Sequence, residues 1–324
     1  MLNDAPAIGG ATWEGEAPSE PGAHVRTAGS AGASPSRASS AHSPHLSNRL
    51  KDAFETARKL LLAERTPTGY WVGELATSAL STATAVGAFA LLQRSGHARP
   101  ADVGLIDGGL AWLEGYQNED GGWGDTNRSV SNISTSMLCR AAFHLAGRAS
   151  THEATLKRAI TYLDDKCGPG VRNHAEGIRR QHGTDRTFSV PILATCAHAG
   201  LVEWGEVPRL PFELACFPQS WFRFLQLPVV SYALPALIAL GQAIHAHRPP
   251  RDPVTRLVRR MAKDRSLRVL ESIQPESGGF LEATPLTSFV VMSLASIGHG
   301  AHPVFSARDA VLVRKHAAGW KLAD

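Results

Sequence analysis

Cysteine is the residue whose spacing would most readily indicate metal or redox chemistry in this chain. The four cysteines are Cys139, Cys167, Cys196 and Cys216. No pair has the spacing of a metal-binding or redox motif, and no histidine follows one at zinc-finger spacing. We therefore expect four reduced, partly buried thiols in a cytosolic protein, with no metal site and no disulfide.

Histidine and aspartate each form one close pair. His245 and His247 stand beside Arg248, but no third residue has a sensible spacing for a metal ligand. We interpret this pair as a polar helix end, where protonated histidine suits the helix dipole. Asp164 and Asp165 are the only adjacent aspartates, and we expect them at a solvated helix end.

Charge indicates no nucleic-acid partner. The chain of 324 residues has 33 Lys+Arg against 29 Asp+Glu, a surplus of +4 that is too small for a nucleic-acid footprint. Six basic residues gather in one run: Arg256, Arg259, Arg260, Lys263, Arg265 and Arg268. We interpret the run as the solvated face of an outer helix. The more specific alternative is that this run contacts anionic lipid headgroups.

The chain should begin with a tail. Residues 1–47 are rich in Ala, Gly, Ser and Pro, which predicts disorder, and order is expected from Ser47 as an N-cap.

Early acidic residues and the lack of an apolar run argue against a secretion signal. The most apolar segment, 227–244, is interrupted by Pro235 and predicts a buried helix. The expected location is cytoplasmic, at most peripheral to the inner face of the cell membrane.

The elements that must position any site are helices. Abundant Ala, Leu, Arg and Glu, together with few alternating patterns, predict an all-α fold, and 43% hydrophobic residues suffice for a large core. The expected helices are roughly 48–64, 76–95, 103–117, 131–147, 153–166, 187–200, 229–246, 254–273 and 286–298.

An internal repeat organises these helices. Each copy has a glutamine or arginine, then a glycine four residues later and an aromatic residue two further on. The copies are Arg65, Gly69 and Trp71; Gln117, Gly121 and Trp123; and Gln274, Gly278 and Phe280. The glycines lie 52 and 157 residues apart, which indicates a unit of two helices and about fifty residues.

The motif has a structural explanation. The glycine suits the tight turn after a helix end, and the aromatic side chain is expected to pack back onto the helix pair. The glutamine amide lies where it can bind free backbone carbonyls. Each copy should therefore join an outer helix to the apolar helix that follows.

The unit from Gly109 to Trp123 is similar to the QW repeat of the squalene–hopene and oxidosqualene cyclase family, whose general form is K/R-G-x-x-F/Y/W-L-x-x-x-Q-x-x-x-G-x-W. The segments 69–75 and 211–214 also resemble these cyclases. The resemblance covers about residues 50–304. It implies an α/α toroid, in which an outer ring of helices surrounds an inner ring. In the family, two such units form a complete enzyme around an apolar cavity.

The resemblance implies carbocationic polycyclisation of a linear C30 isoprenoid such as squalene, in triterpenoid and hopanoid synthesis, with no cofactor. In the family an aspartate of a D-x-D-D motif supplies the proton, and aromatic faces stabilise the cations. This sequence contains no D-x-D-D. The resemblance therefore implies the N-terminal half of a cyclase, inactive alone, and assigns no catalytic residue.

Four residues match substrate-facing positions of the family. Tyr232 stands where the family presents an aromatic side chain, and its alternative is a core tyrosine with a satisfied hydroxyl. Ala283, Thr284 and Pro285 match an Ile-Gln-Pro run at the cavity. The alternative, which we favour, is a helix start with Thr284 as the cap and Pro285 in the first turn.

The repeat is lost near the end of the chain. Residues 48–304 form the expected toroid domain, whereas 305–324 fit no frame of the repeat. We hypothesise a truncation or frameshift just after Val304, which the other reading frames of the DNA would test.

Two other classes remain open. One is a non-catalytic α/α toroid that binds a polyprenoid or a partner protein, which the missing acid favours. The other is a protein prenyltransferase β-subunit, which ranks last because it needs Asp, Cys and His ligands for zinc. The oligomeric state cannot be inferred from the sequence.

Overall fold

The computed structural model describes residues 44–65, 67, 69, 71, 77–217, 233–276, 278–280 and 283–299. Residues 1–43 of the predicted tail (1–47) and the whole of the predicted divergent end (305–324) lie outside these residues. The chain divides into two compact units, Met1–Val72 and Gly73–Asp324.

Among its described residues, the first unit contains one helix and one copy of the repeated turn. Helix α1 spans Pro44–Ala63. The prediction that order begins at Ser47 was wrong, because the helix starts three residues earlier. A proline is well suited to a first helical turn, where its missing N–H costs no hydrogen bond.

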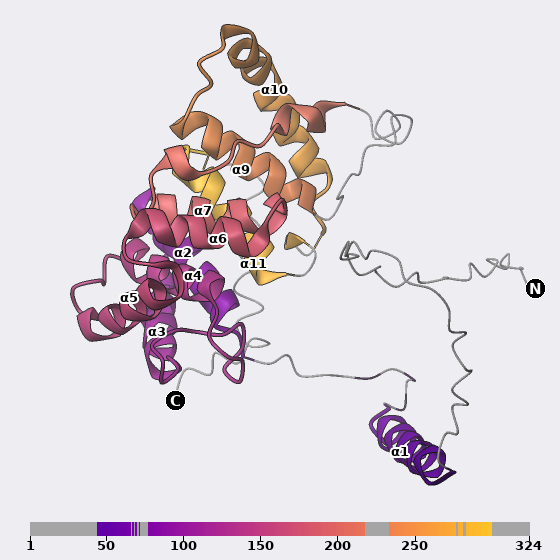
Figure 1. Ribbon diagram of the computed structural model, residues 1–324. Helices are drawn as coiled ribbons and strands as arrows, with labels where there is room; N and C mark the ends of the chain where they lie inside the picture. Colours follow the sequence, from indigo (N-terminus) through magenta and orange to yellow (C-terminus); the bar gives the residue numbers. More distant parts are fainter. Residues whose placement is uncertain are drawn as a thin grey trace, which may run out of the picture. The chain divides into compact units, whose positions relative to one another are not determined.

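An inner ring of helices forms the centre of the second unit. Its members are α2 (Ala79–Arg94), α4 (Ile133–Leu145), α7 (Arg186–His198), α9 (Leu234–His247) and α11 (Thr284–Ser296). Each packs against the next in this order, and α11 packs back against α2, which closes the ring. Figure 1 shows α2, α4, α7 and α11 gathered in the middle of this unit.

Outer helices cover the ring. They are α3 (Pro100–Gly115), α5 (Glu153–Cys167), α6 (Val171–His182) and α10 (Pro253–Ser272). Helix α3 packs on α2, α5 on α4, α6 on α7, and α10 on α9. Two short 3-10 helices, η1 (Trp204–Glu206) and η2 (Phe212–Cys216), lie in the connection between α7 and α9. The predicted all-α, toroid-like fold is confirmed.

The two layers differ in how their helices are buried. Helix α2 is rich in Ala, Thr and Gly and is buried on every side, as expected of a helix with apolar or small residues all round. Helix α10 buries only one face and exposes the other. Three inner helices meet at Gly87, where an added Cβ would lie 3.0 Å from the Met292 sulfur and 3.2 Å from a Leu145 methyl group.

Local sequence signals explain four of the helix starts. Side chains that cap the first turn begin several helices: Ser78 for α2, Asn132 for α4, Asp185 for α7 and Asp252 for α10. Each accepts a hydrogen bond from a backbone N–H in that turn, which satisfies a donor that the helix itself leaves free.

One helix was not predicted. Helix α6 has few large apolar residues, and its buried residues are His174, Ala175, Gly177 and Ile178. Gly177 packs so closely that an added Cβ would clash with the Cys167 side chain. The predicted helix 229–246 starts at Leu234, and residues 218–232 lie outside the described residues.

Candidate substrate-facing site

The central repeated turn ties two outer helices together. The Gln117 amide nitrogen donates to the Gly121 carbonyl at 2.7 Å and to the Thr155 carbonyl of α5 at 2.9 Å. The Trp123 indole nitrogen donates to the Leu113 carbonyl of α3 at 2.8 Å. These bonds satisfy carbonyls at a helix end and a turn, as the repeat predicted.

The other copies reproduce this geometry. The Gln274 amide nitrogen donates to the Gly278 carbonyl at 2.9 Å. In the first unit the Arg65 guanidinium makes the same bond to the Gly69 carbonyl at 2.8 Å, so arginine replaces glutamine without loss of the contact. The same hydrogen bond to the glycine carbonyl is therefore present at all three copies.

The three glycines are required by the backbone. Gly69, Gly121 and Gly278 have φ angles of 95°, 87° and 78°, which side-chain-bearing residues rarely adopt. At Gly121 an added Cβ would also lie 2.5 Å from the Arg158 carbonyl oxygen. Both backbone angle and space therefore exclude a larger residue at Gly121.

A second contact fastens the turns at Trp123 and Phe280 to the inner helix that follows each of them. The backbone N–H of Trp123 donates to the Ser136 hydroxyl of α4 at 2.9 Å, and that of Phe280 donates to the Thr287 hydroxyl of α11 at 3.0 Å. All four residues are buried. We name this contact the hydroxyl clamp. The sequence analysis missed it, although a Ser or Thr in the first turn of each helix was a visible signal.

The clamp places the three predicted site residues of α11. Ala283 is the N-cap, and Thr284 and Pro285 begin the helix. All three are partly exposed, directly before the buried Thr287. The prediction that Thr284 caps the helix was wrong, since the cap position is Ala283 and makes no side-chain hydrogen bond. Thr287 instead binds the turn. Pro285 is in the first turn, as predicted.

Of the four predicted residues, Ala283, Thr284 and Pro285 lie together at the start of α11. Tyr232 lies outside the described residues. The described part therefore shows a partly exposed helix start beside the buried apolar core of the ring.

Asp164 is less solvated than predicted. Its carboxylate lies 2.7 Å from Nε2 of His174, which is 2% exposed, and the Nδ1 of that histidine faces a buried Arg140 nitrogen at 3.5 Å. Asp165 is exposed and pairs with Lys166, as expected of a surface residue. The adjacent aspartates therefore divide between an internal polar network and solvent.

Both histidines of the pair lie in the last turn of α9, as predicted. The His247 ring stacks on Trp204 of η1 with ring centroids 4.3 Å apart, and His198 of α7 meets that tryptophan edge-on at 4.8 Å. Partial burial lowers the pKa of both His245 and His247, which disfavours the protonated form expected at a polar helix end.

One residue of the basic run is buried. Arg259 is 5% exposed, lies over the Phe212 ring at 5.6 Å and pairs with Glu213 at 3.1 Å. The prediction of a solvated face was wrong for this residue. It holds for the other five, which are exposed: Arg256, Arg260, Lys263, Arg265 and Arg268.

The thiols have the environment of structural cysteines. Cys139 and Cys196 are buried, and burial raises the pKa of each, that of Cys196 to about 12. Cys167 and Cys216 are partly buried, and all four are free. Within the described residues, no three His, Cys, Asp or Glu side chains gather as metal ligands would.

Comparison with known proteins agrees with this architecture. Residues 54–260 match the family described as the squalene-hopene cyclase N-terminal domain, which is more than half of the chain. The chain belongs to the squalene-hopene cyclase family. The predicted family is thereby confirmed.

Two relatives in this family are triterpene-related enzymes. The chain is 30% identical over 184 residues to the squalene hopane cyclase of Aspergillus fumigatus, covering 56% of this chain and 21% of the relative. It is 29% identical over 204 residues to the enfumafungin synthase of Hormonema carpetanum, covering 61% of this chain and 13% of that relative. The match thus spans a small part of each relative.

Among the described helices, none is both long and apolar enough to cross a bilayer.

Proposed function

We propose that this chain supplies the N-terminal, hydrocarbon-binding part of a squalene-hopene-type triterpene cyclase. The family match over residues 54–260 is the observation that carries the proposal. The ring of inner helices with outer helices around it supports the proposal, because this is the α/α arrangement that the family resemblance implies. The substrate class is a linear C30 isoprenoid such as squalene.

Four residues are proposed to contact that substrate. Ala283, Thr284 and Pro285 would border it at the partly exposed start of α11. Tyr232 would offer an aromatic face, which attracts developing positive charge. In this proposal the repeated turns position α11 and do not touch the substrate.

The chemistry of the reaction limits what the chain does alone. Polycyclisation starts when an acid protonates a terminal alkene, and the family's D-x-D-D motif does not occur in this sequence. We therefore propose that the isolated chain binds the polyene without cyclising it. It would act in the cytoplasm, with the exposed basic residues of α10 suited to a peripheral contact with an anionic membrane.

Incubation of the purified full chain with radiolabelled squalene tests both parts of this proposal. We expect squalene to be retained on the protein through gel filtration and no cyclic product by gas chromatography with mass spectrometry. Tyr232→Ala should reduce retention roughly tenfold, the effect of removing one aromatic contact from a buried hydrocarbon. Tyr116→Ala is the matched control, because Tyr116 is exposed at the end of α3.

The outcomes separate the alternatives. Formation of hopene would contradict the assignment of an inactive chain. Failure to retain squalene, in a protein that still unfolds cooperatively, would contradict hydrocarbon binding and favour a non-catalytic module for a partner protein. Equal losses in both tyrosine variants would contradict the role of Tyr232.

A further inference from the structure

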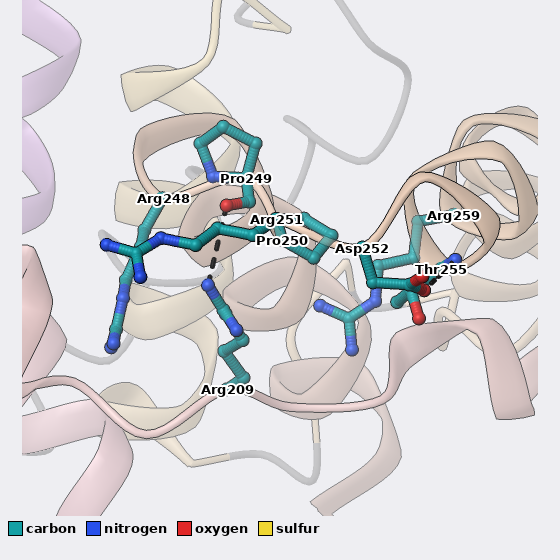
Figure 2. Close-up of a pocket in the computed structure, with 8 residues that line it drawn as sticks. All are labelled: Arg209, Arg248, Pro249, Pro250, Arg251, Asp252, Thr255 and Arg259. Atoms are coloured by element: carbon teal, nitrogen blue, oxygen red, sulfur yellow. Dashed lines mark hydrogen bonds between the residues drawn. The ribbon is translucent and has the colours of Figure 1, made fainter.

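A cavity separate from the ring interior lies where α9 ends and α10 begins. Its volume is about 590 Å³, and Figure 2 shows its lining. The lining residues are Arg209, Arg248, Pro249, Pro250, Arg251, Asp252, Thr255 and Arg259. Four guanidinium groups therefore face one carboxylate. Such an excess of positive charge around a cavity suits an anionic ligand.

The one carboxylate in the lining is already engaged. Asp252 caps α10 by accepting a hydrogen bond from the Thr255 backbone N–H at 2.6 Å. Hydrogen bonds from Thr255 also lower the pKa of this carboxyl, which keeps it ionised at the helix start. The same helix start adds a partial positive charge near the cavity, from the free N–H groups of a 20-residue helix.

Arg259 is the buried cation of the cavity. It donates through Nη2 to the Leu210 carbonyl at 3.2 Å and pairs through Nε with Glu213 at 3.1 Å. Its Nη1 is buried and has no hydrogen-bond partner within the described residues. A buried guanidinium nitrogen without an acceptor is costly, and an oxygen of a bound anion would satisfy it.

Arg209 also has a buried guanidinium nitrogen without a hydrogen-bond partner. Its Nη2 makes a long hydrogen bond of 3.4 Å to the Pro249 carbonyl, and its Nε is buried without a partner in the described part of the chain. Figure 2 shows the bond to Pro249 and the Arg209 side chain reaching into the cavity from the segment before η2. Two different segments thus bring unsatisfied guanidinium nitrogens to the same cavity.

The remaining cations have different roles. Arg248 donates to the Gly205 carbonyl at 2.7 Å and to the Val207 carbonyl at 3.3 Å, which fastens the segment that carries Arg209. Arg251 is exposed at the turn and makes no hydrogen bond or ion pair within the described residues. Arg248 therefore builds the cavity wall, whereas Arg251 is able to close over a ligand.

We propose that this cavity binds the phosphate group of a phosphorylated ligand through Arg209, Arg251 and Arg259. Guanidinium groups suit phosphate because they present paired N–H donors to its oxygens. A tetrahedral phosphate offers acceptors in several directions, which matches donors that arrive from two segments of the chain. The phosphate is either that of a soluble small molecule or that of a lipid headgroup.

Titration of the full chain with pyrophosphate, followed by isothermal calorimetry and thermal unfolding, tests the soluble source. Vesicles of phosphatidylcholine with phosphatidic acid, compared with phosphatidylcholine alone in cosedimentation, test the lipid source. We expect Arg209→Gln and Arg251→Gln each to weaken binding of the responding probe at least tenfold. Arg260→Gln is the matched control, because Arg260 is an exposed arginine of α10 that does not line the cavity.

These variants avoid Arg259, whose loss would leave the partly buried Glu213 unpaired and endanger folding. Pyrophosphate binding that depends on Arg209 and Arg251 supports a soluble ligand, and the same dependence in vesicle binding supports a lipid headgroup. No binding of either probe overturns the proposal. Binding that Arg260→Gln weakens as much as Arg209→Gln also overturns it, since general surface charge would then explain the affinity.

Discussion

At the scale of the residue, the repeat depends on glycine more than on its aromatic member. Phe280 replaces tryptophan in one copy and remains buried, so this position accepts a change of ring. Gly121 accepts no side chain, because its φ of 87° strains any residue other than glycine and an added Cβ would clash with the Arg158 carbonyl. The residue with the smallest side chain is therefore the most restricted.

Gly121→Ala should destabilise the fold by about 2–4 kcal/mol, the combined effect of a strained backbone and an overpacked contact. Gly147→Ala is a matched control, because Gly147 also has a positive φ, 67°, but an added Cβ meets no atom within 4 Å. The control should cost only about 1 kcal/mol. Urea unfolding of both variants measures the difference. Equal losses would show that the Arg158 carbonyl imposes no constraint.

At the scale of the element, α7, η1 and α9 are joined by an aromatic cluster of His198, Trp204 and His247. Burial, with a smaller effect from His247, lowers the pKa of His198 to about 3. The folded state therefore binds this proton less readily than the unfolded chain, whose histidine titrates near the ordinary value. The contribution of neutral His198 is complete above about pH 6.5 and is lost as the pH falls toward 3.

Acidification from pH 7 to pH 5 should therefore remove about 1–2 kcal/mol of stability through His198 alone. His198→Phe keeps an aromatic ring against Trp204 but cannot be protonated. Denaturant unfolding of the protein and the variant at both pH values isolates this contribution as a double difference. A variant with an unchanged pH dependence would contradict the buried, neutral histidine.

At the scale of the whole molecule, ring closure requires α2, α4 and α11 to approach one another closely. Gly87 of α2 provides the space, with the Met292 sulfur and a Leu145 methyl group on either partner helix. Cores packed this tightly do not accept added methyl groups without strain. Closure of the ring therefore depends on the absence of a side chain at one position.

Gly87→Leu should destabilise the second unit by about 1–3 kcal/mol or more through overpacking. Gly104→Leu is the matched control, because Gly104 is exposed in α3 and an added Cβ would have no atom within 4 Å. That control should gain about 0.5–1 kcal/mol from better helix propensity. Thermal unfolding compares the two variants. A stabilised Gly87→Leu variant would show that the space between these helices can hold a larger side chain.

Periodic signals predicted much of this fold. The repeated turns and the apolar inner helices follow from local sequence, since each depends on residues close together in the chain. Helix α6 was missed because tertiary contact, not an apolar stripe, holds it. The burial of Arg259 was missed because its partner Glu213 lies 46 residues away. Of the candidate site, Pro285 was placed correctly, whereas the capping role given to Thr284 was not.

The hydroxyl clamp has a consequence for how such a chain can vary. The clamp joins the backbone N–H of the aromatic residue to a side-chain hydroxyl. That hydroxyl lies 13 residues later at α4 but only 7 residues later at α11. Both ends are fixed, so the intervening loop can change length while the helices keep their places. Loops between a turn and the next inner helix are therefore the positions where insertions would be tolerated, and where new surface chemistry could arise without altering the ring.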